Sequence, residues 1–162
     1  MMLLTLMPRV RTADIWQIIE LIKYLMLLAI LLRETIRDIR EREIDIGVPI
    51  AYGIIAFISN FIPGQGDILS CLGGAGIGAT VLVIAYLKRE SIGIGDGIML
   101  IVTGAALGTY LNLILIIRTA LLAGIGAIIL IIIRKRRKMA ADTMPLMPYI
   151  LLSYISICVR FV

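Results

Sequence analysis

Long runs of apolar residues, separated by short polar stretches, dominate the pattern along this chain. An α-helix needs about 20 apolar residues to cross roughly 30 Å of hydrocarbon, and several runs approach that length. A β-barrel would instead show short segments of alternating hydrophobicity, and the chain has no such pattern. The pattern therefore predicts an all-α fold and a polytopic integral membrane protein.

The breaks between the runs predict six transmembrane helices in a single membrane-embedded domain, residues 1–162. The longest stretch, Ile98 to Ile133, carries one charge, Arg118, and as one straight helix it would extend more than about 50 Å. Since a single membrane crossing needs a shorter helix, we expect two helices in this stretch, with a break between Gly108 and Asn112. The expected helices are approximately 15–36, 48–62, 68–87, 97–107, 112–133 and 146–161.

The basic residues predict the orientation. They follow the first, third and fifth expected helices and therefore all fall on one side, which the positive-inside rule makes cytoplasmic. We expect a multi-pass protein of the cell membrane with both termini outside. Because the net charge of +5 sits in these short loops, we do not expect nucleic-acid binding. The clusters are Arg33, Arg37, Arg40 and Arg42, then Lys88 and Arg89, then 134–138.

The composition, which is 60% hydrophobic, limits which side chains could be catalytic groups or metal ligands. The chain has no His, which excludes imidazole catalysis and His ligation of metals. Its two cysteines, Cys71 and Cys158, are too few for a structural zinc site, which takes four ligands. Acidic side chains remain as the candidate catalytic groups, and we expect no metal and no cofactor.

The motif Gly-x-Gly-Asp occurs twice, ending at Asp67 and at Asp96. The expected topology places Asp38 and Asp96 on the cytoplasmic side and Asp67 on the outer side, about 30 Å away. Asp38 and Asp96 can therefore meet, whereas Asp67 is interpreted as a loop residue. Gly93 and Gly95 lack a Cβ atom and would let a peptide backbone approach, so we predict that they bind substrate.

Two adjacent aspartates suit peptide hydrolysis. One carboxylate deprotonates water while one carboxylic acid protonates the carbonyl, and two close carboxyl groups share a proton because both cannot ionise cheaply. The alternative is that Asp38 belongs to a solvated charged surface with its neighbours Arg37, Arg40 and Glu41.

Four features follow one another along the chain: Asp38, Gly93 to Asp96, a basic loop and Pro145-x-x-Pro148. Their order resembles that of the type IV prepilin peptidase family, including its archaeal preflagellin-peptidase branch. The resemblance covers most of the chain and implies a six-helix aspartyl protease with Asp38 and Asp96 as catalytic residues. Two positions depart from the family pattern: Gly97-Ile98 replaces Val-Lys, and Asp45-Ile46 stands where Pro-Asn is common.

The same resemblance implies a substrate. The enzyme would remove the short basic leader from a prepilin-like or preflagellin-like precursor at the cytoplasmic membrane face, after a Gly. Larger bacterial members also carry a cysteine-tetrad segment and methylate the product. No such segment is present here, so we expect peptidase activity without methyltransferase activity.

Two alternatives stay open. A presenilin-like intramembrane protease would also use Gly-x-Gly-Asp, but it pairs a Tyr-Asp with it, and Arg37 precedes Asp38 here. A small membrane transporter would instead use charges at mid-bilayer depth. Glu20, Lys23 and Arg118 are the candidates for that role.

Overall fold

The protein was analysed as a computed structural model that describes residues 12–41, 45–62, 67–88, 93–137 and 145–161. These ranges form helices, which confirms the all-α prediction. The assigned helices number five instead of six, because both segments expected at 97–107 and 112–133 belong to one kinked helix. They are α1 (Thr12–Arg40), α2 (Gly47–Ser59), α3 (Ile68–Lys88), α4 (Ile94–Arg137) and α5 (Met147–Phe161).

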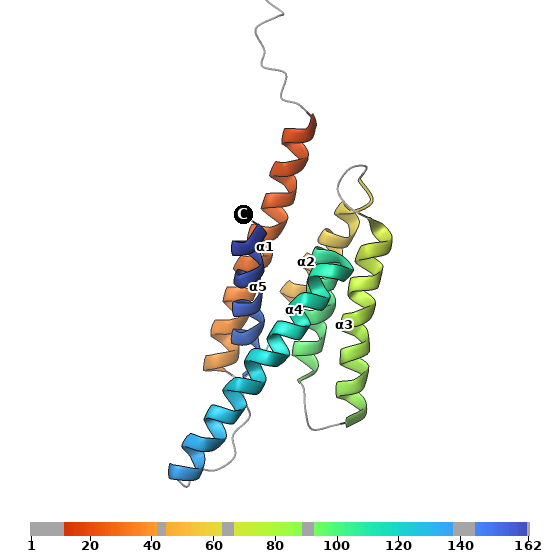
Figure 1. The fold of residues 1–162 in the computed structure, drawn as a ribbon. Coiled ribbons are helices and arrows are strands. Elements are labelled where there is room, and N and C mark those ends of the chain that lie inside the picture. Colours follow the sequence, from red (N-terminus) through yellow and green to blue (C-terminus); the bar gives the residue numbers. More distant parts are fainter. Residues whose placement is uncertain (1–11, 42–44, 63–66, 89–92, 138–144, 162) are drawn as a thin grey trace, which may run out of the picture.

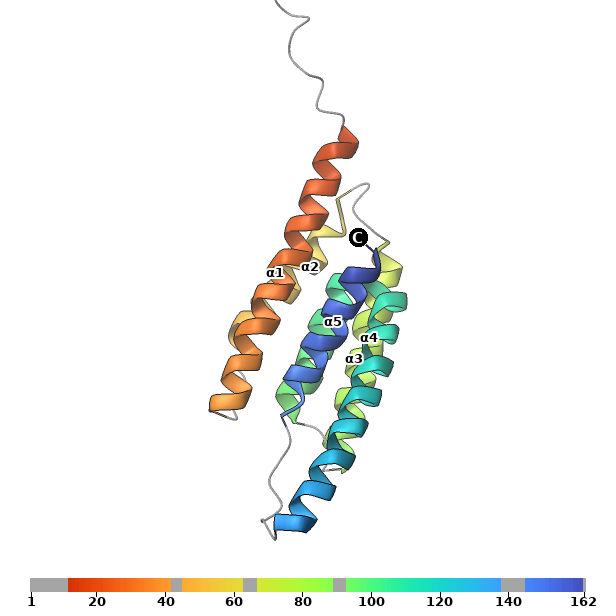
Figure 2. The same ribbon diagram turned by 60° about the vertical axis from the view of Figure 1, so that its left-hand side comes forward.

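The helix α4 folds back on itself at Gly108. This residue has φ 77° and ψ 179°, a backbone conformation that glycine adopts without steric cost. The Asn112 side-chain amide donates a hydrogen bond of 3.2 Å to the Leu100 carbonyl, although a straight helix would separate the two by about 18 Å. Accordingly, the two parts of α4, green and then turquoise to blue, run in opposite directions (Figures 1 and 2).

Hydrogen bonds that involve polar side chains connect this turn to α3. The Thr109 N–H donates to Ser70 Oγ at 3.1 Å, and Thr109 Oγ1 donates to the Ser70 carbonyl at 2.6 Å. Asn112, which is fully buried, also donates to the Gly74 carbonyl at 2.9 Å. The first of these bonds satisfies the Thr109 N–H, which the break in α4 would otherwise leave without a partner.

Glycines allow the first part of α4 to lie directly against α3. A Cβ atom on Gly74 would come within 2.5 Å of the Gly104 carbonyl oxygen, and one on Gly78 would meet the Leu100 backbone at similarly short range. Gly76, in contrast, faces open space. The two helices thus approach closely at Gly74 and Gly78 and not at Gly76.

The helices alternate in direction, so the molecule has two distinct ends (Figures 1 and 2). The end of α1, the start of α4 and the start of α5 lie together at one end, which we call the aspartate end because Asp38, Asp96 and Met147 lie there. The end of α2, the start of α3 and the fold-back of α4 lie at the opposite end, which we call the turn end.

The surface and the interior have an unusual distribution of polarity. Large apolar side chains point outward on every helix, among them Leu21, Ile55 and Leu121, which are 56%, 59% and 63% exposed. Polar side chains, including Lys23, Asn60 and Asn112, are buried between helices together with an apolar core. Apolar side chains therefore face both inward and outward, and so large an exposed apolar surface is not what water favours.

Length and composition test the membrane prediction in part. In the described ranges, one helical stretch, Ile94–Ile133, is long and apolar enough to cross a membrane. Three others are apolar but shorter: Gly47–Ser59, Ile68–Ile84 and Met147–Val159. The six expected crossings and their orientation therefore stay predictions.

Candidate active site

Asp38 and Asp96 lie at the same end of the molecule and are both buried. Asp38 belongs to the last turn of α1, which continues to Arg40 and so extends past the expected end at residue 36; Asp96 belongs to the first turn of α4. Only 8% of Asp38 and 9% of Asp96 is exposed. Their carboxyl groups are close enough for the charge of Asp38 to act on Asp96, so the fold brings together two residues that are 58 positions apart (96 − 38).

Gly93 and Asp96 form the start of α4. The Gly93 carbonyl accepts the first helical hydrogen bond, from Gly97 N–H at 3.2 Å, and the Gly93 N–H donates back to the Asp96 side chain. An acidic residue three positions into a helix commonly caps it in this way. The second oxygen of Asp96, Oδ1, is buried and has no hydrogen-bond partner among the described residues.

The Asp38 carboxylate is held by the start of α5. Its Oδ2 accepts a hydrogen bond of 3.1 Å from the backbone N–H of Met147, the first residue of that helix. The amides at the start of a helix lack partners within the helix and favour a negative group. The Pro145-x-x-Pro148 segment thus leads into a helix that positions one candidate catalytic residue. Composition and spacing gave no sign of this contact.

The second Gly-x-Gly-Asp motif has a structural role at the turn end. Asp67 Oδ1 accepts a hydrogen bond of 3.0 Å from Leu69 N–H, and the Asp67 carbonyl accepts one of 3.0 Å from Cys71 N–H. This is the geometry of an N-terminal cap on α3. Asp67 therefore lies at the far end of the bundle from Asp38. Gly64 to Gly66 of the motif are outside the described residues.

The two glycines predicted to bind substrate lie just before Asp96 in the chain. Gly93 is exposed and Gly95 is half-buried. A Cβ atom on Gly93 would lie 3.2 Å from Asp96 Oδ2, so a larger residue there would crowd the carboxylate. A peptide backbone has room at Gly93, and binding of substrate by the two glycines stays a prediction.

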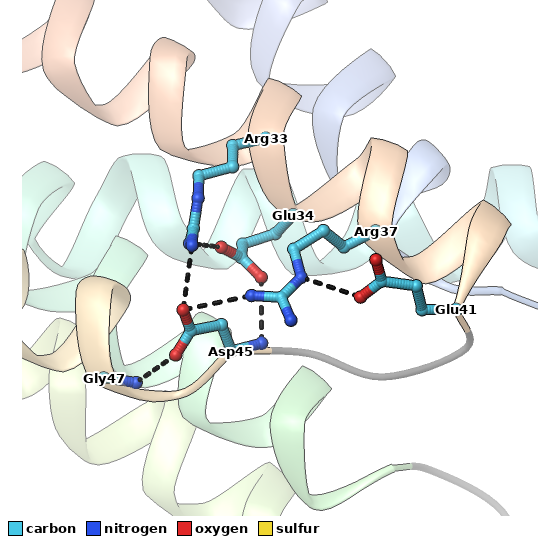
Figure 3. Close-up of polar contacts among 6 residues, drawn as sticks. All are labelled: Arg33, Glu34, Arg37, Glu41, Asp45 and Gly47. Atoms are coloured by element: carbon cyan, nitrogen blue, oxygen red, sulfur yellow. Dashed lines mark hydrogen bonds and ion pairs between the residues drawn. The ribbon is translucent and has the colours of Figure 1, made fainter.

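An ion-pair cluster connects the end of α1 to the start of α2, close in sequence to Asp38 (Figure 3). Asp45 Oδ2 pairs with Arg33 Nη2 at 2.8 Å and with Arg37 Nη1 at 3.0 Å, and Asp45 Oδ1 accepts from Gly47 N–H at 3.1 Å. The Arg33 guanidinium and the Gly47 amide hold the pKa of Asp45 below its usual value. Buried Glu34 pairs with Arg33 and accepts from the Asp45 N–H at 3.0 Å.

Asp45 connects the arginines of α1 to the Gly47 amide at the start of α2. Arg37 also pairs with Glu41 at 3.1 Å. The neighbours of Asp38 are engaged in this cluster and with one another, whereas Asp38 is buried on another part of α1. The prediction that Asp38 merely belongs to a solvated charged surface does not fit its burial.

The charges that the transporter alternative would use have partners. Lys23 Nζ donates to Asn60 Oδ1 at 3.3 Å, and Glu20 accepts from the Tyr24 hydroxyl at 3.0 Å. Arg118 Nη1 donates to Ser156 Oγ at 2.8 Å. The bonds of Lys23 and Arg118 connect different helices, and the bond of Glu20 connects adjacent turns of α1.

Two further features bear on ligands. In the part of the chain that the structure describes, no three side chains of His, Cys, Asp or Glu gather as a metal site requires. An apolar cavity of about 350 Å³ is lined by Leu82, Val83, Tyr86, Leu87 and Ile94. Ile94 and Asp96 are about 200° apart around α4, so the cavity and the aspartate pair lie on different faces.

Comparison with known proteins leaves the family assignment open. No family model matches the chain, and no curated protein or solved structure matches it either. The aspartate pair itself is therefore the main evidence for function.

Proposed function

We propose that this protein is a membrane aspartyl endopeptidase that removes the short basic leader of prepilin-like or preflagellin-like precursors at the cytoplasmic face. The observation that carries the proposal is the burial of Asp38 and Asp96 at one end of the bundle, where the charge of Asp38 acts on Asp96. Buried carboxyl pairs are costly to maintain, and such pairs concentrate where they serve catalysis.

The membrane location rests on the exposed apolar surface of the fold. Exposed Leu and Ile side chains cover the outer surface of all five helices, while buried amides and hydroxyls connect them. Lipid solvates the exposed apolar side chains, and hydrogen bonds inside the bundle satisfy the buried polar groups. In this proposal the two parts of α4 cross separately, which makes six crossings, and the aspartate end faces the cytoplasm because the basic clusters lie there.

The different partners of the two carboxyl groups support distinct roles. Asp38 accepts a backbone N–H and would act as the base that removes a proton from water. Among the described residues, the buried Oδ1 of Asp96 has no hydrogen-bond partner, and we place the shared proton there. Water oxygen bonds to the peptide carbon as its proton passes to Asp38. The carbonyl oxygen takes the proton of Asp96, which gives a tetrahedral diol. The C–N bond then breaks as the leaving nitrogen takes a proton from Asp38 and one hydroxyl of the diol returns its proton to Asp96.

The test is cleavage of a synthetic precursor by the purified chain in lipid vesicles, with product masses identifying the bond that is cut. The precursor carries a basic leader ending in Gly, followed by an apolar helix. A cut after that Gly supports the proposal. A cut within the apolar helix would favour a presenilin-like protease. Cleavage by Asp38→Asn at the wild-type rate would refute the assignment of Asp38.

A further inference from the structure

A buried hydroxyl beside Asp38 has no partner. Thr35 Oγ1 and Asp96 Oδ1 are the buried side-chain oxygens that lack a hydrogen bond among the described residues, and Thr35 is only 8% exposed. A buried hydroxyl without a hydrogen bond loses its bonds to water and gains none in return, so it destabilises the fold. Such groups are rare in folded proteins and call for a specific explanation.

Other hydroxyls in the helices avoid this cost. Thr80 Oγ1 donates to the Gly76 carbonyl at 2.9 Å, and Ser153 Oγ donates to the Tyr149 carbonyl at 2.7 Å. Both bonds reach back four residues, as hydroxyls inside helices commonly do. Thr35 lies inside α1 and makes no such bond, so its hydroxyl stays available to another group.

The geometry of α1 places Thr35 next to Asp38. At about 100° per residue, Asp38 lies between Glu34 and Thr35 around the helix, about 60° from Thr35 and one turn further along. Glu34, on one side, binds the start of α2 through Asp45 N–H. Thr35 lies on the other side of Asp38, on the buried part of the helix.

We propose that Thr35 is a catalytic residue whose hydroxyl donates a hydrogen bond to the carbonyl oxygen of the scissile peptide as that carbon becomes tetrahedral. This inference rests on the proposed protease function. The hydroxyl stabilises the negative charge that develops on the oxygen before Asp96 protonates it. A donor aimed at a developing oxyanion acts mainly on kcat.

The experiment compares Thr35→Val, which keeps the shape of the side chain, with Thr35→Ser, which keeps the hydroxyl. The reaction is cleavage of the synthetic precursor in vesicles. We expect Thr35→Val to lower kcat by about 100-fold with little change in KM, and Thr35→Ser to retain most of the rate. Thr80→Val is the matched control, since its hydroxyl bonds within α3, and its rate should be unchanged. If Thr35→Val does not fold by circular dichroism, Thr35→Ala takes its place.

The outcomes separate this inference from the protease proposal. A Thr35→Val rate close to wild type, with Asp38→Asn inactive, would overturn the role of Thr35 and leave the protease intact. A Thr35→Ser rate as low as that of Thr35→Val would also overturn it, because the hydroxyl would then not be the active element. A wild-type chain that does not cleave the precursor would overturn both.

Discussion

The backbone N–H of Met147, the first residue of α5, donates a hydrogen bond of 3.1 Å to Oδ2 of Asp38 near the end of α1. These residues are 109 positions apart in the chain. The contact does two things at once: it satisfies an amide at the start of a helix, and it fixes one oxygen of a buried carboxylate beside Asp96.

This contact predicts that two substitutions of Asp38 differ in stability. Asn keeps an oxygen that can accept the Met147 N–H, whereas Ala does not. We expect Asp38→Ala to be less stable than Asp38→Asn by about 1 kcal/mol, the usual contribution of a capping side chain. Thermal unfolding in detergent micelles measures the difference. Equal stability of the two variants would mean that the Met147 contact contributes nothing to folding.

The contact between α3 and α4 predicts a strong effect of one added methyl group. In Gly104→Ala the new Cβ would overlap the backbone of Gly74. Because backbone atoms of packed helices cannot move independently, we expect a loss of about 2 kcal/mol or more. Thermal unfolding, together with the yield of folded protein, measures the loss.

The matched control for that variant is Gly76→Ala. Gly76 belongs to the facing helix α3 but has nothing within 4 Å of an added Cβ atom. Alanine also favours the helix, by roughly 0.5–1 kcal/mol over glycine. We therefore expect Gly76→Ala to be as stable as wild type or slightly more stable. A comparable loss in both variants would contradict the close helix contact.

The ion pairs between α1 and α2 predict a dependence of stability on acid. Arg33 holds the pKa of Asp45 below its usual value, so the stabilisation is present above the ordinary carboxyl pKa and is lost as the pH falls through the lowered one. We expect Asp45→Asn to lack this part of the loss over the acid range below the ordinary carboxyl pKa of about 4. Thermal unfolding temperatures of both chains over that range test it. Parallel curves would exclude a stabilising role of the ion pairs.

The helical nature of the fold and its main break could be predicted from the sequence. Continuous apolar runs of this length predict helices. The stretch from Ile98 to Ile133 is too long for one membrane crossing, so the chain was expected to reverse its direction within it. Gly108, at one edge of the expected break, adopts the positive φ. The extension of α1 to Arg40 was missed, because its last turn is polar and depends on the Arg37–Glu41 pair and the ion pairs to Asp45.

Less of the candidate site could be predicted. Sidedness alone was enough to distinguish Asp96 from Asp67, since helices of alternating direction put them at opposite ends. The Met147 amide and the unpaired hydroxyl of Thr35 gave no sequence signal. A backbone donor is the same at every residue, and a threonine inside an apolar run usually bonds to its own helix. Only the packed arrangement reveals which groups are left without partners.

The most direct test of the account is the initial rate of leader cleavage for four chains: wild type, Asp38→Asn, Asp96→Asn and Asp67→Asn. Each substitution removes a charge and keeps the shape of the side chain, and Asn caps a helix as well as Asp does, so Asp67→Asn controls for folding. We predict that Asp38→Asn and Asp96→Asn each abolish cleavage, while Asp67→Asn keeps the wild-type rate. Cleavage at the wild-type rate by either Asp38→Asn or Asp96→Asn would contradict the central claim that these two residues form one catalytic pair.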